Sequence, residues 1–349
     1  MKKLAIFIGR FSPVHKGHLN VIENALQTSD KVLILIGSSN APRDIRNPWT
    51  FKEREDMLRI GIQESTNISL SNQNIAFEPL EDFLYQDNLW SQQVQKYADK
   101  HAKLMKQSKN DQVEIKIHGH DKDETTWYIK SFPQWGDPIT SAPFNSLNAT
   151  DIRKSYFNGV DTVEIDGLTP RVKNYLTGFA LSDQYKYIQR EFAFQKLHDE
   201  KWSTAPYAPT FNTVDTIVVQ SGHILLIERK ASPSPGTWAL PGGYLNPSEF
   251  MLDGALRELR EETGLKVPEK VLRGCVVAAE TFDDPKRSTR GRVITRVFYI
   301  QLNDSSELPH VKGGDDASKA KWFTLNQFLK MRDKIFEDHY SVIRVMLKI

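Results

Sequence analysis

The sequence predicts an α/β protein with two domains, the first built on a parallel sheet and the second on a mixed sheet. Its 349 residues exceed what one ordinary hydrophobic core accommodates. In the first half, continuous apolar runs at 4–9 and 31–37 alternate with helical segments, which is typical of parallel strands joined by crossover helices. In the second half, strand-like runs surround one amphipathic helix at 248–263, which indicates helices packed around a mixed sheet.

The composition is that of a globular protein with balanced charge. Charged residues make up 26% and hydrophobic residues 39%, and the formal net charge is +2. That charge is too close to zero to indicate a nucleic-acid-binding surface. The single cysteine, Cys275, permits no disulfide within the chain, and no apolar run reaches the length of a membrane span. We therefore expect a cytoplasmic protein with neither nucleic acid nor membrane as a partner.

The first domain is expected to span 1–180. After the strand at 4–9, a helix at 19–26 has one apolar side, and the strand at 31–37 follows. The remaining elements are expected to be a strand at 75–80, one helix or two at 83–105, a strand at 113–119 and a closing helix at 163–179. In such sheets the ligand binds beyond the carboxyl ends of the strands.

A junction at 181–206 is expected to separate the domains. It begins with a charged helical segment and ends in a stretch with two prolines and no periodicity, so the boundary is placed near Pro206. The helical segment can pack on either domain or on a second subunit, and a homo-oligomer is one of the arrangements that this allows.

The second domain is expected to span 207–349. Strands at 213–220 and 223–230 are separated by Ser221 and Gly222, a hairpin signal. The later elements are expected to be strands at 270–282 and 292–302, a strand turning into a helix at 320–328, and a final helix from Lys334.

Three glutamates mark the helix at 248–263. Glu258, Glu261 and Glu262 are spaced i, i+3, i+4, so their carboxylates leave one helix face, and Arg257 can pair with Glu261. A hard divalent cation with oxygen ligands would remove the repulsion between them. The alternative interpretation is a solvated acidic helix face, which would be preferred if these residues stood alone.

The surrounding pattern makes the metal interpretation the stronger one. Gly243 is followed after five residues by Glu249, after seven more by Arg-Glu-Leu-Arg-Glu-Glu, and then by Thr-Gly-Leu. This stretch resembles the Nudix box without a departure. The resemblance implies Glu258 and Glu262 as ligands of Mg²⁺, with Mn²⁺ as the other candidate, and Glu261 as a sharing or orienting carboxylate.

The same resemblance implies a pocket for a nucleoside diphosphate derivative. The segment 284–295 is similar to one found in Nudix hydrolases that act on ADP-ribose. The candidate contacts to phosphate are Arg229, Arg290 and Arg292, those to the base are Trp238 and Tyr244, and the carbonyl of Gly242 or Gly243 is a further oxygen donor. The general base is sought at Asp315, Asp316 or Glu307, although an acidic surface loop explains these residues equally well.

In the first domain, two histidines follow the strand at 4–9. His15 and His18 lie one helical turn apart at a helix start, where free N–H groups attract phosphate, and Gly17 allows close backbone approach. A pair of surface histidines capping a helix is the alternative. The longer stretch 9–18, GRFSPVHKGH, resembles the HXGH nucleotidyltransferase superfamily, which implies a Rossmann-like domain. It adds Gly9, Arg10 and Phe11 to the candidate nucleotide contacts.

A second motif of that superfamily, ISXTXIR, has its counterpart at 147–153. Here Thr150 is expected to cap a helix and contact phosphate, and Arg153 to bind the triphosphate of ATP. Asn148 stands where the superfamily usually has serine, which leaves one hydroxyl contact in doubt.

Two further stretches resemble the nicotinamide-mononucleotide adenylyltransferase subgroup. One is the loop at 37–55, and the other is 118–135. The candidate contacts to ATP or to nicotinamide mononucleotide are Arg43, Arg46, Asn47, Trp49 and Arg54 in the first, and Asp121 and Trp127 in the second.

Both halves together resemble bifunctional nicotinamide-mononucleotide adenylyltransferase/ADP-ribose pyrophosphatases. The resemblance implies Mg²⁺ at both sites and two reactions: adenylyl transfer from ATP to nicotinamide mononucleotide, and hydrolysis of ADP-ribose to AMP and ribose 5-phosphate. Two alternatives stay open. The second domain would be a sensor without turnover, or either domain would use other substrates, because pocket shape rather than motif selects a substrate.

Overall fold

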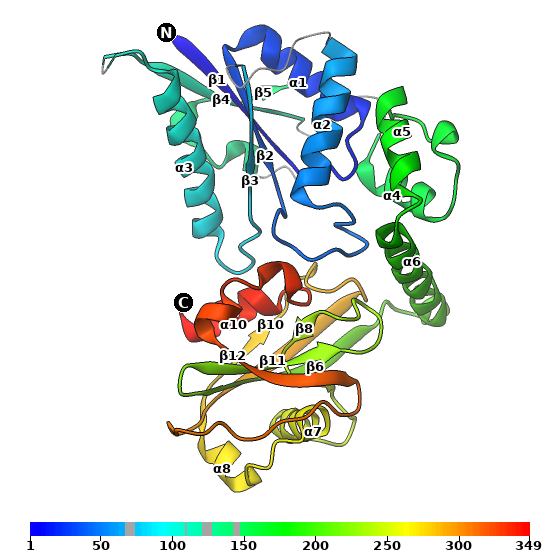
Figure 1. Ribbon diagram of the computed structural model, residues 1–349, viewed down its shortest axis with the longest axis vertical. Helices are drawn as coiled ribbons and strands as arrows, with labels where there is room; N and C mark the ends of the chain where they lie inside the picture. The colour runs from blue at the N-terminus through cyan, green and yellow to red at the C-terminus, as the bar shows by residue number, and fades with distance from the viewer. Residues whose placement is uncertain (67–73, 109, 121–127, 142–146) are drawn as a thin grey trace. The chain divides into compact units, whose positions relative to one another are not determined.

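The computed structural model describes residues 1–66, 74–108, 110–120, 128–141 and 147–349 (Figure 1). The chain forms two compact units, Met1–Gln189 and Arg190–Ile349. The division falls within helix α6 (Asp183–Trp202).

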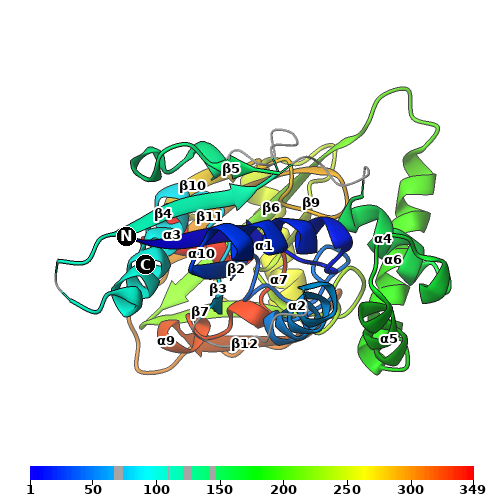
Figure 2. The same cartoon turned by 90° about the horizontal axis from the view of Figure 1, so that it is seen from above.

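The first unit is built on a five-stranded parallel sheet in the order β3-β2-β1-β4-β5. Its strands are β1 (Lys2–Gly9), β2 (Lys31–Ile36), β3 (Ile75–Pro79), β4 (Val113–Gly119) and β5 (Ile139–Thr140). Figure 2 shows the short β5 beside the end of β4. The parallel sheet predicted from the alternation of strands and helices is confirmed.

Helices cover the sheet of the first unit on both sides (Figure 1). The helices are α1 (Lys16–Thr28), α2 (Phe51–Thr66), α3 (Asp87–Met105), α4 (Ala149–Phe157) and α5 (Pro170–Phe179). Alternate residues of β1, namely Leu4, Ile6 and Ile8, pack with Val94 and Ala98 of α3, as the period of two in a strand requires. The segment 83–105, for which one helix or two were predicted, contains the single helix α3, which begins at Asp87.

The second unit contains a mixed sheet whose main order is β10-β11-β6-β7-β12, and this also confirms the prediction. Strands β6 and β11 are parallel, whereas the other pairs are antiparallel. The strands are β6 (Thr210–Gln220), β7 (His223–Arg229), β8 (Trp238–Ala239), β9 (Gly242–Tyr244), β10 (Val276–Phe282), β11 (Arg292–Gln301) and β12 (Ala317–Thr324).

Helix α7 (Met251–Thr263) packs Leu256 and Leu259 against Val218 and Ile300 of the sheet. It ends as predicted at Gly264, which adopts the left-handed conformation with φ 60°. Figure 1 shows α10 (His339–Leu347) on the other side of the sheet from α7. The short α9 (Leu325–Phe328) contacts α10, because the rings of Phe328 and Tyr340 lie 5.0 Å apart.

Several predicted boundaries in the second unit were wrong. Helix α7 begins at Met251 instead of 248, and the final helix begins at His339 instead of Lys334. The start of the predicted strand at 270–282 is helical, because α8 (Glu269–Gly274) precedes β10. No helix within the described ranges combines the length and apolarity that a membrane crossing requires.

Candidate active sites

The first candidate site begins where β1 ends. Phe11 has φ 52°, a conformation that non-glycine residues rarely adopt. A Cβ on Gly9 would lie 2.9 Å from the Phe11 ring, so the folded-back ring requires glycine at that position. This turn places exposed Arg10 at the carboxyl edge of the sheet.

The two histidines follow this turn and stack on each other. Their ring centroids are 3.7 Å apart, and the backbone N–H of His15 donates to Nδ1 of His18 at 3.3 Å. Nδ1 of His18 is therefore unprotonated, which leaves Nε2 as the nitrogen that carries the proton in the neutral ring. His15 is 3% exposed and His18 is partly exposed. The carbonyl of Gly17, between them, lies 3.2 Å from Nε2 of His120.

Arg153 reaches the same turn from α4. Its guanidinium donates to the carbonyl of Ser12 at 2.5 Å and to the hydroxyl of Thr150 at 3.2 Å. Burial and the nearby charge of Arg10 lower the pKa of Arg153 to about 10, so it stays a cation at neutral pH. The predicted cap was wrong, because Asn148, not Thr150, accepts the backbone N–H of Asp151 at 2.8 Å. The hydroxyl of Thr150 instead holds Arg153.

Two predicted ligand contacts in the loop at 37–55 have a structural role instead. Arg54 is 1% exposed, and its guanidinium donates to the carbonyls of Arg10, Gly37 and Ser38 at 2.6–3.2 Å. Trp49 is also 1% exposed and packs among aromatic rings of α4 and α5. Neither side chain is available to a nucleotide in this structure, because Arg54 donates to backbone carbonyls and Trp49 is enclosed by aromatic rings.

Four further predicted nucleotide contacts are either engaged within the protein or lie outside the described residues. Arg43 pairs bidentately with Glu53 at 2.7 and 2.8 Å, so its guanidinium is already engaged. Asn47 is 7% exposed and its amide lies 3.5 Å from the carbonyl of Ser38. Asp121 and Trp127 lie outside the described residues.

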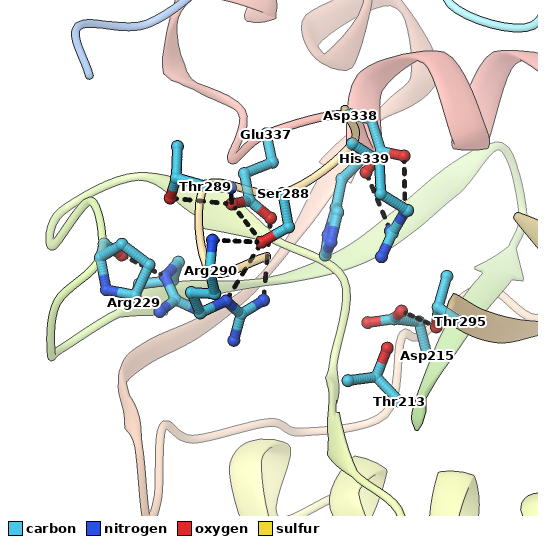
Figure 3. Close-up of polar contacts among 12 residues, drawn as sticks. Thr213, Asp215, Arg229, Ser288, Thr289, Arg290, Thr295, Glu337, Asp338 and His339 are labelled. Atoms are coloured by element: carbon cyan, nitrogen blue, oxygen red, sulfur yellow. Dashed lines mark hydrogen bonds and ion pairs between the residues drawn. The ribbon is translucent and has the colours of Figure 1, made fainter. Parts of the chain in front are cut away.

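The second candidate site is a cavity of about 300 Å³ in the second unit. It lies within the size range of small-molecule sites. The residues that line it include Phe194, His198, Asp215, Arg229, Gly242, Gly243, Tyr244, Glu262, Arg287, Arg290, Asp316, Phe336 and His339. Figure 3 shows part of this set, with Arg229 and Arg290 on one side and Asp215 on the other.

Carboxylates of α7 and β6 form one side of the cavity. Glu262 is 5% exposed and accepts the backbone N–H of Gly242 at 2.9 Å. Burial, together with the charges of Glu258 and Asp215, raises the pKa of Glu262 to about 8. Burial also raises the pKa of Glu258. A Cβ on Gly243 would lie only 2.5 Å from the carboxylate of Glu258. Glycine at position 243 therefore leaves the space that the Glu258 carboxylate of α7 occupies beside β9.

The carboxylates fit a divalent cation, although they do not form a complete cage. Burial destabilises their charge, and a hard cation with oxygen ligands would offset that cost. Within the described ranges, no three His, Cys, Asp or Glu side chains are already arranged around one metal position. Glu261 is 44% exposed and pairs with Arg257 at 2.9 Å, as the spacing predicted. Arg257 also binds Glu249 and Glu258, and so holds the acidic helix face together.

Two arginines form the opposite side of the cavity. The Arg229 guanidinium lies 4.0 Å from the centroid of the Phe336 ring, and that of Arg290 lies 5.6 Å from the centroid of the Tyr244 ring. Nε of Arg290 is 3.3 Å from the hydroxyl of Ser288. Cations held against aromatic faces keep their N–H groups directed at a ligand, and planar guanidinium suits phosphate oxygens.

The segment that carries Arg290 is anchored on the start of α10 (Figure 3). Arg287 and Asp338 form a bidentate ion pair at 2.9 and 2.9 Å, with 3% and 0% of their side chains exposed. Glu337 accepts from the Ser288 hydroxyl at 2.8 Å and from the backbone N–H of Thr289 at 3.0 Å. Residues 287–289 thus fix this wall of the cavity through Glu337 and Asp338.

Three predicted contacts lie elsewhere. Trp238 packs against Phe323, with ring centroids 4.7 Å apart, and does not line the cavity. Arg292 binds Asp283 and is likewise absent from the lining. Of the candidate general bases, Asp316 lines the cavity, whereas Glu307 is exposed and does not.

The sequence reasoning missed several lining residues. Asp215 had a visible signal, because it is a charged residue within the apolar strand at 213–220. It is 6% exposed and accepts a hydrogen bond from Thr295. Phe336 and His339 had none, since they reach the cavity only through the packing of α10. The Nδ1 atom of His339 accepts the backbone N–H of Leu240 at 3.0 Å.

Comparisons with known proteins divide the chain at similar positions. The cytidylyltransferase-like family matches residues 6–168, and the NUDIX domain family matches residues 209–346. The nicotinamide/nicotinic acid mononucleotide adenylyltransferase of Acinetobacter baylyi is 33% identical over 197 residues, which cover 54% of this chain and 93% of the relative. The ADP-ribose pyrophosphatase of Methanocaldococcus jannaschii is 37% identical over 129 residues, which cover 36% of this chain and 70% of the relative.

Solved structures extend the likeness to the whole chain. The chain is similar to a bifunctional NMN adenylyltransferase/ADP ribose pyrophosphatase from Francisella tularensis, with 35% sequence identity and a TM-score of 0.90. The match covers 100% of this chain and 99% of the Francisella chain. The structure of the Francisella tularensis enzyme complexed with AMP and a manganese ion has the same identity and coverage, and a TM-score of 0.89.

Proposed function

The chain belongs to the family of bifunctional NMN adenylyltransferase/ADP-ribose pyrophosphatases, and we propose that it carries out both reactions. One unit transfers the adenylyl group of ATP to nicotinamide mononucleotide, giving NAD and diphosphate. The other hydrolyses ADP-ribose to AMP and ribose 5-phosphate. The observation that carries the proposal is that each compact unit holds its own anion site: stacked His15 and His18 beside Arg153 in one, and an arginine-lined cavity ending at Glu262 in the other.

For adenylyl transfer, the chain contributes position and charge. The phosphate of the mononucleotide attacks the α-phosphorus of ATP, and diphosphate leaves, so no covalent bond to the protein is needed. We assign His15, His18 and Arg153 to the phosphates, where N–H donors and a cation stabilise the charge that develops on the transferred group. Arg10 and Arg46 add positive charge near Arg153.

For hydrolysis, Arg229 and Arg290 are assigned to the diphosphate. Water attacks one phosphorus and the bond to the bridging oxygen breaks. Asp316 is our candidate for the base that accepts the proton of that water, because it lines the cavity. The family implies a divalent cation, and we propose Mg²⁺ held by Glu258 and Glu262, with Glu261 orienting. Such an ion, when bound, neutralises the diphosphate and activates water.

In the transferase unit, the same cation would accompany the phosphates of ATP. We further propose that 1–180 and 207–349 are the functional domains and that 181–206 joins them. We also propose that the protein is cytoplasmic, with which its single cysteine is consistent, and that it self-associates.

The two activities are expected to be separable by single substitutions in the full-length chain. Glu258→Gln should abolish release of AMP from ADP-ribose and spare NAD synthesis, and His18→Ala should do the reverse. Chelation with EDTA should stop hydrolysis, and added Mg²⁺ or Mn²⁺ should restore it. Wild-type protein that binds ADP-ribose with either metal but releases no AMP would instead make the second unit a sensor.

A further inference from the structure

The junction helix α6 contributes to the hydrolase cavity. Glu191, Phe194 and His198 are spaced i, i+3, i+7, so they lie on one face of the helix. Phe194 and His198 line the cavity together with residues of the sheet. Leu197, which precedes His198, is 60% exposed and is not among the lining residues. Both lining residues precede residue 209, where the match to the NUDIX domain begins.

Hydrogen bonds fix this helix to the second unit. Glu191 is 5% exposed, and its carboxylate accepts from the Ser232 hydroxyl at 2.7 Å and from the backbone N–H of Ser234 at 2.6 Å. Ser232 itself lines the cavity. Further along, the rings of His198 and Trp202 lie 5.8 and 5.2 Å from that of Phe211 on β6. The wall supplied by α6 is therefore anchored at both ends.

The two lining side chains of α6 are aromatic rings, and neither is among the rings against which Arg229 and Arg290 lie. Phe194 and His198 face a lining that includes Tyr244, whose ring lies 5.8 Å from that of Phe211. The diphosphate is assigned to Arg229 and Arg290, which come from β7 and from the segment that precedes β11. Ring faces suit the flat, apolar faces of a purine, whereas the hydroxyls of a ribose require hydrogen-bonding groups. The side chain of His198 is 16% exposed, so part of its ring remains open to a ligand.

We propose that Phe194 and His198 determine the specificity of the hydrolase site by binding the adenine ring of ADP-ribose. This inference rests on the proposed hydrolase function and assigns part of that site to the segment that joins the domains. It predicts that the adenine-containing product is recognised through α6, and that the other product is not.

Product inhibition of ADP-ribose hydrolysis by the full-length protein tests this directly, because it reports on the hydrolase site alone. Phe194→Ala is expected to raise the inhibition constant of AMP about tenfold, the size that loss of one base–aromatic stack produces. The KM for ADP-ribose should rise in parallel, with kcat changed less than about twofold, as for lost uniform binding. The inhibition constant of ribose 5-phosphate should not change.

Three further variants control the experiment. Phe194→Tyr keeps the ring and should restore the wild-type constants, His198→Gln should weaken AMP in the same way as Phe194→Ala, and Leu197→Ala should change nothing. An unchanged constant for AMP in both Phe194→Ala and His198→Gln would overturn the proposal, as would a selective loss of ribose 5-phosphate. Absence of hydrolysis in the wild type would instead refute the proposed function.

Discussion

Removing the carboxylate of Asp338 should strongly destabilise the second unit. Asp338 and Arg287 form a bidentate pair, with side-chain exposures of 0% and 3%, so Asp338→Asn leaves a guanidinium buried without its counter-charge. Breaking a buried pair from one side typically costs about 3–5 kcal/mol. Because the same segment carries Arg290 into the cavity, hydrolysis should weaken as well.

Urea denaturation with each activity as its own readout measures the effect unit by unit. At a slope of about 2 kcal/mol per molar urea, the loss corresponds to a midpoint lowered by roughly 1.5–2.5 M for ADP-ribose hydrolysis. The midpoint for NAD synthesis should not move. Asp333→Asn is the matched control, because Asp333 is exposed nearby and its substitution should cost less than about 0.5 kcal/mol.

The double variant Arg287→Met/Asp338→Leu separates an unpaired charge from lost packing. Replacing a buried ion pair by apolar residues of similar size is often neutral, so most of the stability should return. If Asp338→Asn lost less than about 1 kcal/mol, water would have to reach the guanidinium. A double variant as unstable as the single one would show that packing, rather than the unpaired charge, causes the loss.

Three other substitutions test separate parts of the structure. Gly243→Ala should lower kcat/KM for hydrolysis about 100-fold, because the added Cβ would displace the Glu258 carboxylate. Gly274→Ala is the control and should leave kcat/KM unchanged, because no atom lies within 4 Å of the Cβ that it adds. Burial and three neighbouring arginines lower the pKa of His339, so the unfolded chain binds the extra proton. The contribution of His339 to stability should be full above about pH 6.5 and fall by up to ~1.4 kcal/mol per pH unit below it. The difference in stability between the wild type and His339→Asn, measured by urea titrations between pH 5 and 7.5, should show that slope. Arg54→Met should destabilise the first unit by about 3 kcal/mol and so lower the urea midpoint of NAD synthesis by roughly 1.5 M. A raised KM for ATP at unchanged stability would contradict the role of Arg54 as a structural brace.

Local patterns in the sequence were sufficient for the fold class and for the placement of the motifs. Apolar runs without alternation require strands buried on both faces, which predicted the parallel sheet of the first unit. The end of α7 at Gly264 followed from the left-handed conformation that glycine adopts readily. The i, i+4 pair of Arg257 and Glu261 is equally local, since it depends only on the helical repeat.

The roles of individual side chains depended on contacts that no local pattern contains. Arg54 and Trp49 have the chemistry of nucleotide contacts, but carbonyls and rings distant in the chain had already enclosed them. Thr150 had the chemistry of a cap, yet the adjacent Asn148 took that position. In each case the residue type set what the side chain can do, and its neighbours decided what it does.

What the sequence alone determined is therefore the fold class and the two motifs, because periodicity, glycine conformation and helical spacing act over a few residues. The tertiary structure alone decided which side chains share a cavity. Phe194 and Asp215 each lie more than a hundred residues from His339 along the chain, and the three meet only when α6 and α10 pack beside the mixed sheet. Such long-range contacts follow from the packing of whole elements and leave no periodic signal in the sequence.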